Sequence, residues 1–187
     1  DGTYARWNGN DQYNKNPYWD LYKSDNTTAK DVFRFTGRAV HNITKHLKVQ
    51  GTIGTDINNM NFEDFIARTT PGVLPGKLTN SIFNNRTLNA EILALYNNNW
   101  GDFDLNATLG GNIYEVNNKT TNITGTDQQM DGVVSMMNYA EQNVMPYTYK
   151  KQINSLFGSA SLGYRSTYFL EGTLRGDRSS TLPVANN

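Results

Sequence analysis

The chain contains no cysteine, and it has only two histidines and five prolines among its 187 residues. Without cysteine it can form neither a disulfide framework nor a thiolate zinc site. No stretch of 18 apolar residues occurs, so no transmembrane helix is expected. Acidic and basic residues balance at 17 each, and this zero net charge gives no argument for binding to nucleic acid. The sequence therefore gives no indication of a disulfide-stabilised domain, a thiolate zinc site, a transmembrane helix or a nucleic-acid-binding protein. The spacing of its apolar residues is more informative.

The sequence also lacks the usual start of a secreted protein. Its first residue is Asp1 instead of Met, and no signal peptide follows it. We therefore expect a processed product or a piece of a longer protein. What is present in quantity is uncharged polarity, with 26 Asn and 20 Thr beside 18% charged residues. The hydrophobic fraction of 37% is low for a packed globular domain.

Six segments of about ten residues alternate apolar and polar side chains with a period of two. This period and length are those of a tilted strand that crosses a bilayer. The apolar faces are centred on Phe33 and Phe35, Leu47 and Val49, Leu88 and Ile92, Leu105 and Leu109, Leu156 and Leu162, and Leu170 and Leu174. The opposite faces carry the candidates for an aqueous lumen, which are Arg34, Arg38, Lys48, Glu91, Asp104, Glu171, Arg175 and Asp177. An Arg or Lys facing lipid at the bilayer midplane costs about 2–4 kcal/mol, and the apolar faces carry no charge there.

The connections between these segments alternate between short and long. Short turns lie within three expected hairpins, over residues 31–56, 86–114 and 152–177. Long polar stretches, residues 57–85 and 115–151, separate the hairpins, and in the second of them Met130, Val133 and Met137 have the spacing of a short amphipathic helix. Residues 1–30 form an expected loop region ahead of the first hairpin, and residues 178–187 begin the next loop. Short turns on one rim and long extracellular loops on the other are typical of bacterial outer-membrane barrels.

We therefore predict an all-β fold, an antiparallel meander of about six transmembrane strands, with residues 1–187 forming a single segment. Aromatic side chains gather at the short-turn rim, where an interfacial girdle belongs; they are Tyr96, Trp100, Phe103, Tyr164 and Tyr168. Six strands cannot close an outer-membrane barrel, because the smallest have eight, so the chain would be part of a larger barrel. The alternative is a soluble β-sandwich that binds carbohydrate or serves adhesion. In that fold the same apolar faces would pack dry against a second sheet.

Two stretches near the end of the chain resemble a known family. Leu156-Phe-Gly-Ser-Ala-Ser-Leu-Gly-Tyr164, followed by Leu174-Arg-Gly-Asp-Arg-Ser-Ser-Thr-Leu-Pro183, is similar to the barrel of SusC/RagA-type TonB-dependent transporters of Bacteroidetes. Asn16-Pro-Tyr-Trp19 and Leu109-Gly-Gly-Asn112 also resemble stretches of that family, with less specificity. Arg178 departs from it, since an aromatic residue is more common at that position.

The resemblance implies more than the spacing does. It implies a 22-stranded barrel in the bacterial outer membrane, plugged by an N-terminal domain and importing oligosaccharides or peptides for nutrient uptake. It also implies a SusD-like lipoprotein over the extracellular face and energy supplied through TonB. The plug, the TonB-contacting segment and about sixteen strands would lie outside this chain, so the partners implied here are the lipid bilayer, the substrate and, through the absent parts, the lipoprotein and TonB.

No set of residues predicts an enzyme, a cofactor or a metal site. The two histidines, His41 and His46, flank a short turn, where turn or interface roles are far more common than ligation. The stretch from Asp56 to Ala67 lacks the Gly and Glu that a calcium loop needs.

Aromatic residues beside many amides in the first loop region suit capture of a sugar or peptide, or contact with a lid protein. The candidates for these contacts are Trp7, Tyr18, Trp19 and Tyr22.

Overall fold

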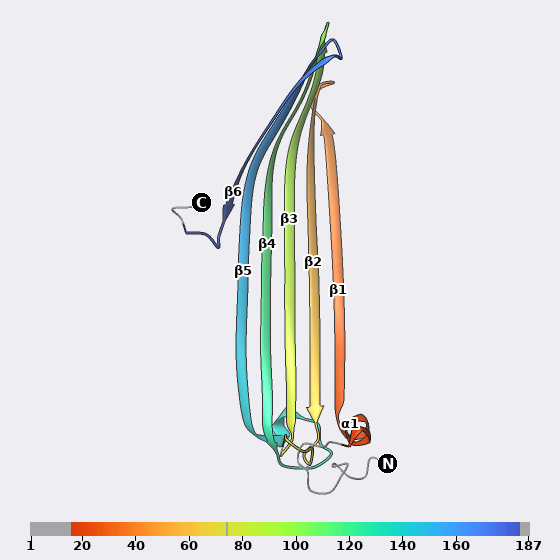
Figure 1. Ribbon diagram of the computed structural model, residues 1–187, viewed down its shortest axis with the longest axis vertical. Coiled ribbons are helices and arrows are strands. Elements are labelled where there is room, and N and C mark those ends of the chain that lie inside the picture. Colours follow the sequence, from red (N-terminus) through yellow and green to blue (C-terminus); the bar gives the residue numbers. More distant parts are fainter. Residues whose placement is uncertain (1–15, 74, 184–187) are drawn as a thin grey trace. The chain divides into compact units, whose positions relative to one another are not determined.

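A computed structural model describes residues 16–73 and 75–183, and it shows one six-stranded antiparallel sheet in which each strand pairs with the next along the chain (Figure 1). The strands are β1 (Asp25–Asn42), β2 (Leu47–Ile66), β3 (Lys77–Trp100), β4 (Phe103–Gln128), β5 (Tyr139–Tyr164) and β6 (Tyr168–Ser179). Two short helices accompany them, α1 (Pro17–Lys23) and the 3₁₀ helix η1 (Met136–Asn138). The predicted all-β meander of six strands is confirmed.

Strands β1 to β5 have 18 to 26 residues, much longer than the ten or so that the alternation predicts, whereas β6 has 12. β2 continues to Ile66 and β3 begins at Lys77, so most of the expected loop 57–85 is strand and the connection is residues 67–76. In the same way, β4 and β5 take up most of the expected loop 115–151. The added end of β4, residues 115–128, is rich in Asn and Thr on both faces and shows no apolar alternation. The added segments are strands because they pair with neighbouring strands, and such pairing cannot be read from the sequence of one segment alone.

Both helices differ from what the sequence pattern predicts. The amphipathic helix expected around Met130 to Met137 is absent, and only the three residues of η1 are helical there. Helix α1 lies within the region expected to be loop. Its start follows ordinary capping rules, because Asn16 accepts a hydrogen bond from the Tyr18 amide at 3.0 Å and Pro17 occupies the first helical position. Among the described residues, neither helix has the length and apolar character needed to cross a membrane.

The described residues fall into two compact units. The first contains residues 16–32, 58–73, 75–84 and 118–148, and the second contains residues 33–57, 85–117 and 149–183. Among the described residues, the buried hydrophobic side chains are Ala67, Leu78 and Tyr139, all in the first unit. The second unit has the three short turns, and its hydrophobic side chains are not enclosed.

This exposure bears on the sandwich alternative. In the second unit Ile92 is 60% exposed and Leu109 is 59% exposed, on strands that a sandwich would cover. The described residues form a single sheet with no second layer. The packing that the soluble β-sandwich requires is therefore not found in this part of the chain.

Candidate functional site

The polar face of the first hairpin carries paired charges. Arg34 on β1 forms an ion pair with Asp56 on β2, and the Arg38 guanidinium donates to Oε1 of Gln50. These contacts cross from one strand to the next, so the four side chains lie on one face of the hairpin. That arrangement agrees with the alternation that placed Arg34 and Arg38 together. Both partners of the Arg34 ion pair are largely exposed, so its contribution to stability is small.

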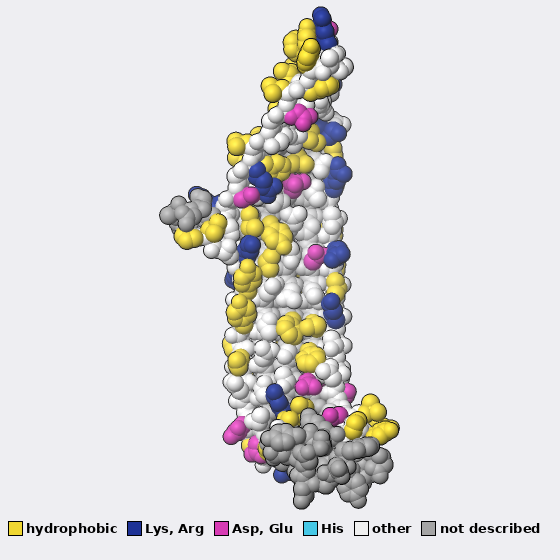
Figure 2. Space-filling view, viewed as in Figure 1, with side chains coloured by type: hydrophobic (Ala, Val, Ile, Leu, Met, Phe, Trp, Pro, Cys, Tyr) yellow, Lys and Arg dark blue, Asp and Glu magenta, His cyan; other side chains and the backbone are white. Residues whose placement is uncertain are grey.

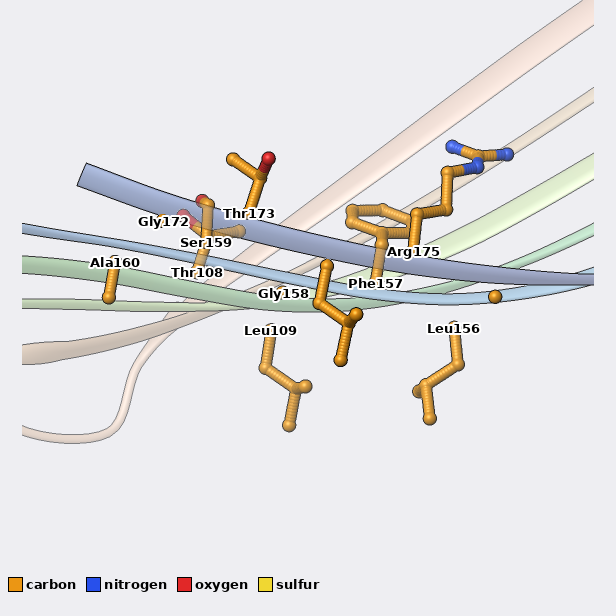
Figure 3. Close-up of a pocket in the computed structure, with 12 residues that line it drawn as sticks. Thr108, Leu109, Leu156, Phe157, Gly158, Ser159, Ala160, Gly172, Thr173 and Arg175 are labelled. Carbon is orange, nitrogen blue, oxygen red and sulfur yellow. The ribbon is translucent and has the colours of Figure 1, made fainter.

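A second polar cluster lies on the hairpin of β5 and β6. The register places Ser155 opposite Asp177 and Phe157 opposite Arg175. Arg175 Nε donates to both carboxylate oxygens of Asp177 at 3.0 Å, and its Nη2 donates to Ser155 Oγ at 3.1 Å. The guanidinium also lies 5.4 Å from the centre of the Phe157 ring. Figure 3 shows Phe157, Thr173 and Arg175 on one side of the strands, with Leu109 and Leu156 on the other.

The remaining lumen candidates are spread over the same strands and are not gathered into one site. Glu171 accepts a hydrogen bond from Ser161 at 3.3 Å, and Asp104 lies beside Gly163. Lys48 is exposed and Glu91 is half-buried. Figure 2 shows basic and acidic side chains interspersed along one face, without a single concentrated patch. The described residues hold no group of three or more His, Asp or Glu side chains suited to a metal ion.

The opposite face of the second unit is an exposed apolar surface. Its exposed hydrophobic side chains include Phe33, Phe35, Ile53, Ile92, Leu109, Ile113, Leu156, Leu162, Leu170 and Leu174. The register pairs Leu162 with Leu170 and Tyr164 with Tyr168, as alternation on a common face requires. At the short turns the rings of Phe103 and Tyr164 lie 4.8 Å apart. A sheet with this surface in water would be an unusual soluble protein.

The aromatic loop candidates divide into two groups. Trp19 donates from Nε1 to Oγ1 of the fully buried Thr70 at 3.0 Å, which attaches α1 to the loop after β2. Tyr18 and Tyr22 are exposed, at 47% and 68%. Trp7 lies outside the described residues. Trp19 therefore has a structural contact, whereas Tyr18 and Tyr22 present their rings to the surroundings.

The loops of the first unit are held by buried amides. Asn138 accepts from the Met130 amide at 2.8 Å and donates to the carbonyls of Met130 and Val133 at 2.7 and 2.8 Å. Gln128, which is fully buried, donates to the Val133 carbonyl, and Arg68 donates to the Gln129 carbonyl. Sequence reasoning missed these residues, because isolated Asn and Gln in a polar stretch carry no spacing signal. These hydrogen bonds give residues 129–138 a fixed conformation on which the neighbouring side chains are displayed.

Phe157 is a further residue whose role the alternation did not predict. It lies on the polar face, and a Cβ at Gly110 would lie 2.4 Å from its ring carbons and 2.7 Å from Leu93 Cδ2. The absence of a side chain at Gly110 therefore makes room for the ring. The signal in the sequence was the Gly110-Gly111 pair, but only the register of β4 against β5 connects it to Phe157.

Solved structures with low sequence identity to this chain share its fold. No protein-family model matches the sequence, and no curated protein matches it. A structure of the RagAB peptide transporter superposes with a TM-score of 0.81 at 16% identity, covering 90% of this chain and 19% of that chain. The RagAB peptide importer in its closed-closed state gives 0.82 at 15% identity, over 91% and 20%, and its open-open state gives 0.78 at 16%, over 89% and 19%. The chain spans about a fifth of those chains and shares the fold of that segment.

Proposed function

We propose that this chain is a segment of an outer-membrane, TonB-dependent transporter that imports peptides or oligosaccharides with a SusD-like lipoprotein partner. The observation that carries the proposal is the separation of faces in the second unit. Across β1 to β6, one face presents exposed hydrophobic side chains, and the other carries the charged side chains, of which Arg34 and Arg175 form ion pairs with Asp56 and Asp177. The superposition on peptide-transporter chains agrees with this interpretation.

Energetics favour lipid on the apolar face. A contiguous exposed surface of this kind invites aggregation in water, and each buried Leu or Ile is worth about 1.5–3 kcal/mol. The polar face, by contrast, could not face lipid, because Arg34, Arg38 and Arg175 would each cost about 2–4 kcal/mol near the midplane. Lipid outside and an aqueous passage inside would satisfy both faces.

The free edges of the sheet argue for a larger barrel. Among the described residues, β1 and β6 each pair with one neighbouring strand, so each leaves an unpaired edge there. Backbone groups exposed to lipid are too costly to leave unpaired, and further strands would close the sheet. A barrel of 22 strands would place the chain as six of them. The lumen candidates Lys48, Glu91, Asp104, Glu171 and Asp177 would then line the passage or touch a plug.

The loop-bearing unit would face substrate and lid. Tyr18 and Tyr22 have exposed rings on α1, and Trp19 holds that helix to the loop after β2. Exposed tyrosines suit stacking on a sugar ring or packing on a peptide, with the many Asn side chains nearby as hydrogen-bond partners. They also suit contact with a lipoprotein lid.

The absence of cysteine allows a direct test of the two faces. Single cysteines would be placed at adjacent positions, Thr108 and Leu109 on β4, and Thr173 and Leu174 on β6, in the complete reading frame with any other cysteine replaced. Each would be labelled with an environment-sensitive fluorophore in proteoliposomes containing spin-labelled lipid. We expect strong lipid quenching at positions 109 and 174 and weak quenching at 108 and 173. Equal quenching within each pair would refute the assignment of faces.

Transport is tested in the producing cell. Deletion of the gene should abolish uptake of a labelled peptide or oligosaccharide mixture, and inactivation of TonB should do the same. Cell fractionation should place the protein in the outer membrane. A protein that is monomeric and cooperatively folded without detergent would instead support the soluble binding domain.

A further inference from the structure

A groove crosses the apolar face of the second unit between β4, β5 and β6. Its volume is about 760 Å³, within the range of about 300–1,000 Å³ that ligand clefts occupy. The walls include Leu109, Leu156 and Leu174, and the floor includes Gly158 and Gly172. Figure 3 shows Leu109 and Leu156 projecting from the same side of the sheet. We call this the leucine groove.

The leucine groove continues toward a polar end. Leu109 and Leu156 also line a second hollow, together with Ile92 and Gly111. Ile92 and Gly111 in turn line a third hollow, which reaches Asn154. The register places Arg178 opposite Asn154, on the same face as Leu174. Arg178 lies four residues beyond Leu174, roughly 13 Å along β6. On β6 the lining of the leucine groove ends at Gly176, so Arg178 lies two residues beyond that end.

Arg178 has the surroundings of an anion-binding group. Its side chain is exposed, and it makes no ion pair within the part of the chain that the structure describes. A lipid-facing arginine without a partner carries a desolvation cost, which falls to about 0–1 kcal/mol near the membrane interface. A phosphate there would satisfy it with paired, charge-assisted hydrogen bonds.

Other charged residues lie on this face, and Arg178 must be compared with them. Arg86 and Lys150 are exposed at positions of the same parity on β3 and β5, and Glu115 is exposed on β4. Glu115 and Lys150 line a separate polar hollow together with Ser180, and neither of them lines the leucine groove. Of these cations, Arg178 lies closest along its strand to the lining of the groove: it is two residues beyond Gly176 on β6, whereas Lys150 is six residues from Leu156 on β5, and Arg86 is on β3, which does not line the groove.

We propose that the leucine groove holds an acyl chain of a phosphate-bearing membrane lipid and that Arg178 binds its phosphate. The inference rests on the proposed function, because it needs this face in a bilayer. Glycines deepen the groove, so a chain seated there gains dispersion contacts on both sides that a flat sheet would not give. The zero net charge of the protein does not oppose this, since the attraction is local to one guanidinium.

The test uses the complete protein in detergent and a fluorescent dimyristoyl phosphatidic acid. Gly172→Leu places a side chain in the groove, at a position where nothing lies within 4 Å of an added Cβ. Gly51→Leu is the matched control, since Gly51 also has open space around its Cβ but lies on β2, outside the groove. Arg178→Gln removes the charge, and Arg86→Gln is its control on the same face.

We expect Gly172→Leu and Arg178→Gln each to weaken binding on the order of tenfold, with both controls near the unsubstituted protein. Dimyristoylglycerol, which lacks the phosphate, should bind weakly and be insensitive to Arg178→Gln. Inorganic phosphate alone should not compete. Equal losses from Arg86→Gln and Arg178→Gln, or competition by free phosphate, would overturn the site. Such a result in a protein that still shows the quenching difference between positions 108 and 109 would leave the proposed transporter standing.

Discussion

Arg165, in the turn between β5 and β6, donates from Nε to Oδ2 of Asp102 at 2.7 Å, and Asp102 lies in the turn between β3 and β4. The Arg165 amide also donates to the Asp102 carbonyl at 2.8 Å. Two hairpins are thus joined at their turns by one side-chain and one backbone contact. Arg165 and Ser166 both have positive φ, near 50°, so this turn is strained for residues other than Gly, Asn or Asp.

The first prediction concerns this contact. Asp102→Asn should lower the free energy of unfolding by only about 0.2–1 kcal/mol, because both side chains are more than half exposed and the backbone bond remains. The loss should shrink as salt rises from 0.05 to about 1 M, since screening already weakens the pair in the unsubstituted protein. Thermal unfolding of the detergent-solubilised protein followed by circular dichroism would measure it. A loss of several kcal/mol, or one indifferent to salt, would show that Asp102 has another role.

The second prediction concerns the close approach of Phe157 to Gly110. Gly110→Ala should destabilise the protein by about 1–3 kcal/mol, because the new methyl group would overlap the ring. Gly51→Ala is the control, and it should be neutral or slightly stabilising, since its Cβ has open space.

A double-mutant cycle separates this clash from a general effect of the substitution. Phe157→Leu would cost stability alone but should relieve Gly110→Ala, so the two changes together should cost less than their sum by about 0.5–3 kcal/mol. Additive losses would mean that the ring does not occupy the space above Gly110.

Much of the second unit was predictable from alternation alone. Arg34 and Arg38 were assigned to one face by parity, and cross-strand contacts to Asp56 and Gln50 place them there. The turns were predictable because polar residues interrupt the alternation at His46, Gly101 and Arg165. These signals are local to a strand or turn, so a single sequence carries them.

The first unit was much less predictable, for two physical reasons. The tail of β4, residues 115–128, is Asn- and Thr-rich on both faces, so its β structure depends on pairing with a neighbouring strand rather than on a hydrophobic pattern. Residues 67–73 and 129–138 are held by long-range contacts such as Trp19 to Thr70 and Arg68 to Gln129. Partners 51 and 61 residues apart leave no mark on local spacing.

The third prediction concerns the loop before β5. Asn138→Ala removes an acceptor and a donor that make three hydrogen bonds, and it leaves the Met130 amide without that partner. Each such bond contributes about 0.5–1.5 kcal/mol, so residues 129–138 should open locally by a few kcal/mol more readily. Hydrogen exchange should rise within this loop and stay unchanged at the turns of the second unit. Asn138→Asp keeps only the acceptor, so hydrogen exchange in this loop should be intermediate between the unsubstituted protein and Asn138→Ala.

The fourth prediction concerns Tyr139, which lies in the loop-bearing unit, outside the proposed membrane-spanning part of β5. Burial raises the pKa of its hydroxyl, and the nearby Glu63 carboxylate adds to the increase. The hydroxyl oxygen is buried and has no hydrogen-bond partner among the residues that the structure describes. Because the folded pKa exceeds the unfolded value of about 10, its contribution to stability is complete below pH 10 and is lost as the pH rises through the folded pKa.

Tyr139→Phe should therefore keep or raise stability at neutral pH, by up to about 1 kcal/mol, and should lessen the loss above pH 10. The matched control is Tyr149→Phe, on the same strand, whose exposed hydroxyl should make no comparable difference. Unfolding measured at pH 7 and at pH 10.5 would decide, and a large loss at neutral pH from Tyr139→Phe would reveal a partner for the hydroxyl.

The fifth prediction separates the two groups of loop aromatics. Tyr22→Ala should reduce substrate uptake several-fold with little change in thermal stability, because its ring is 68% exposed and makes no ring contact within the described residues. Trp19→Phe should instead loosen α1, because it removes the donor to the buried Thr70, and protease should then cut near residue 24 more readily. Thr70→Val should reproduce the effect of Trp19→Phe, since it removes the other half of the same hydrogen bond. If Tyr22→Ala leaves uptake of every tested peptide and oligosaccharide intact but releases a co-purifying lipoprotein, the exposed tyrosines belong to the lid contact rather than to substrate capture.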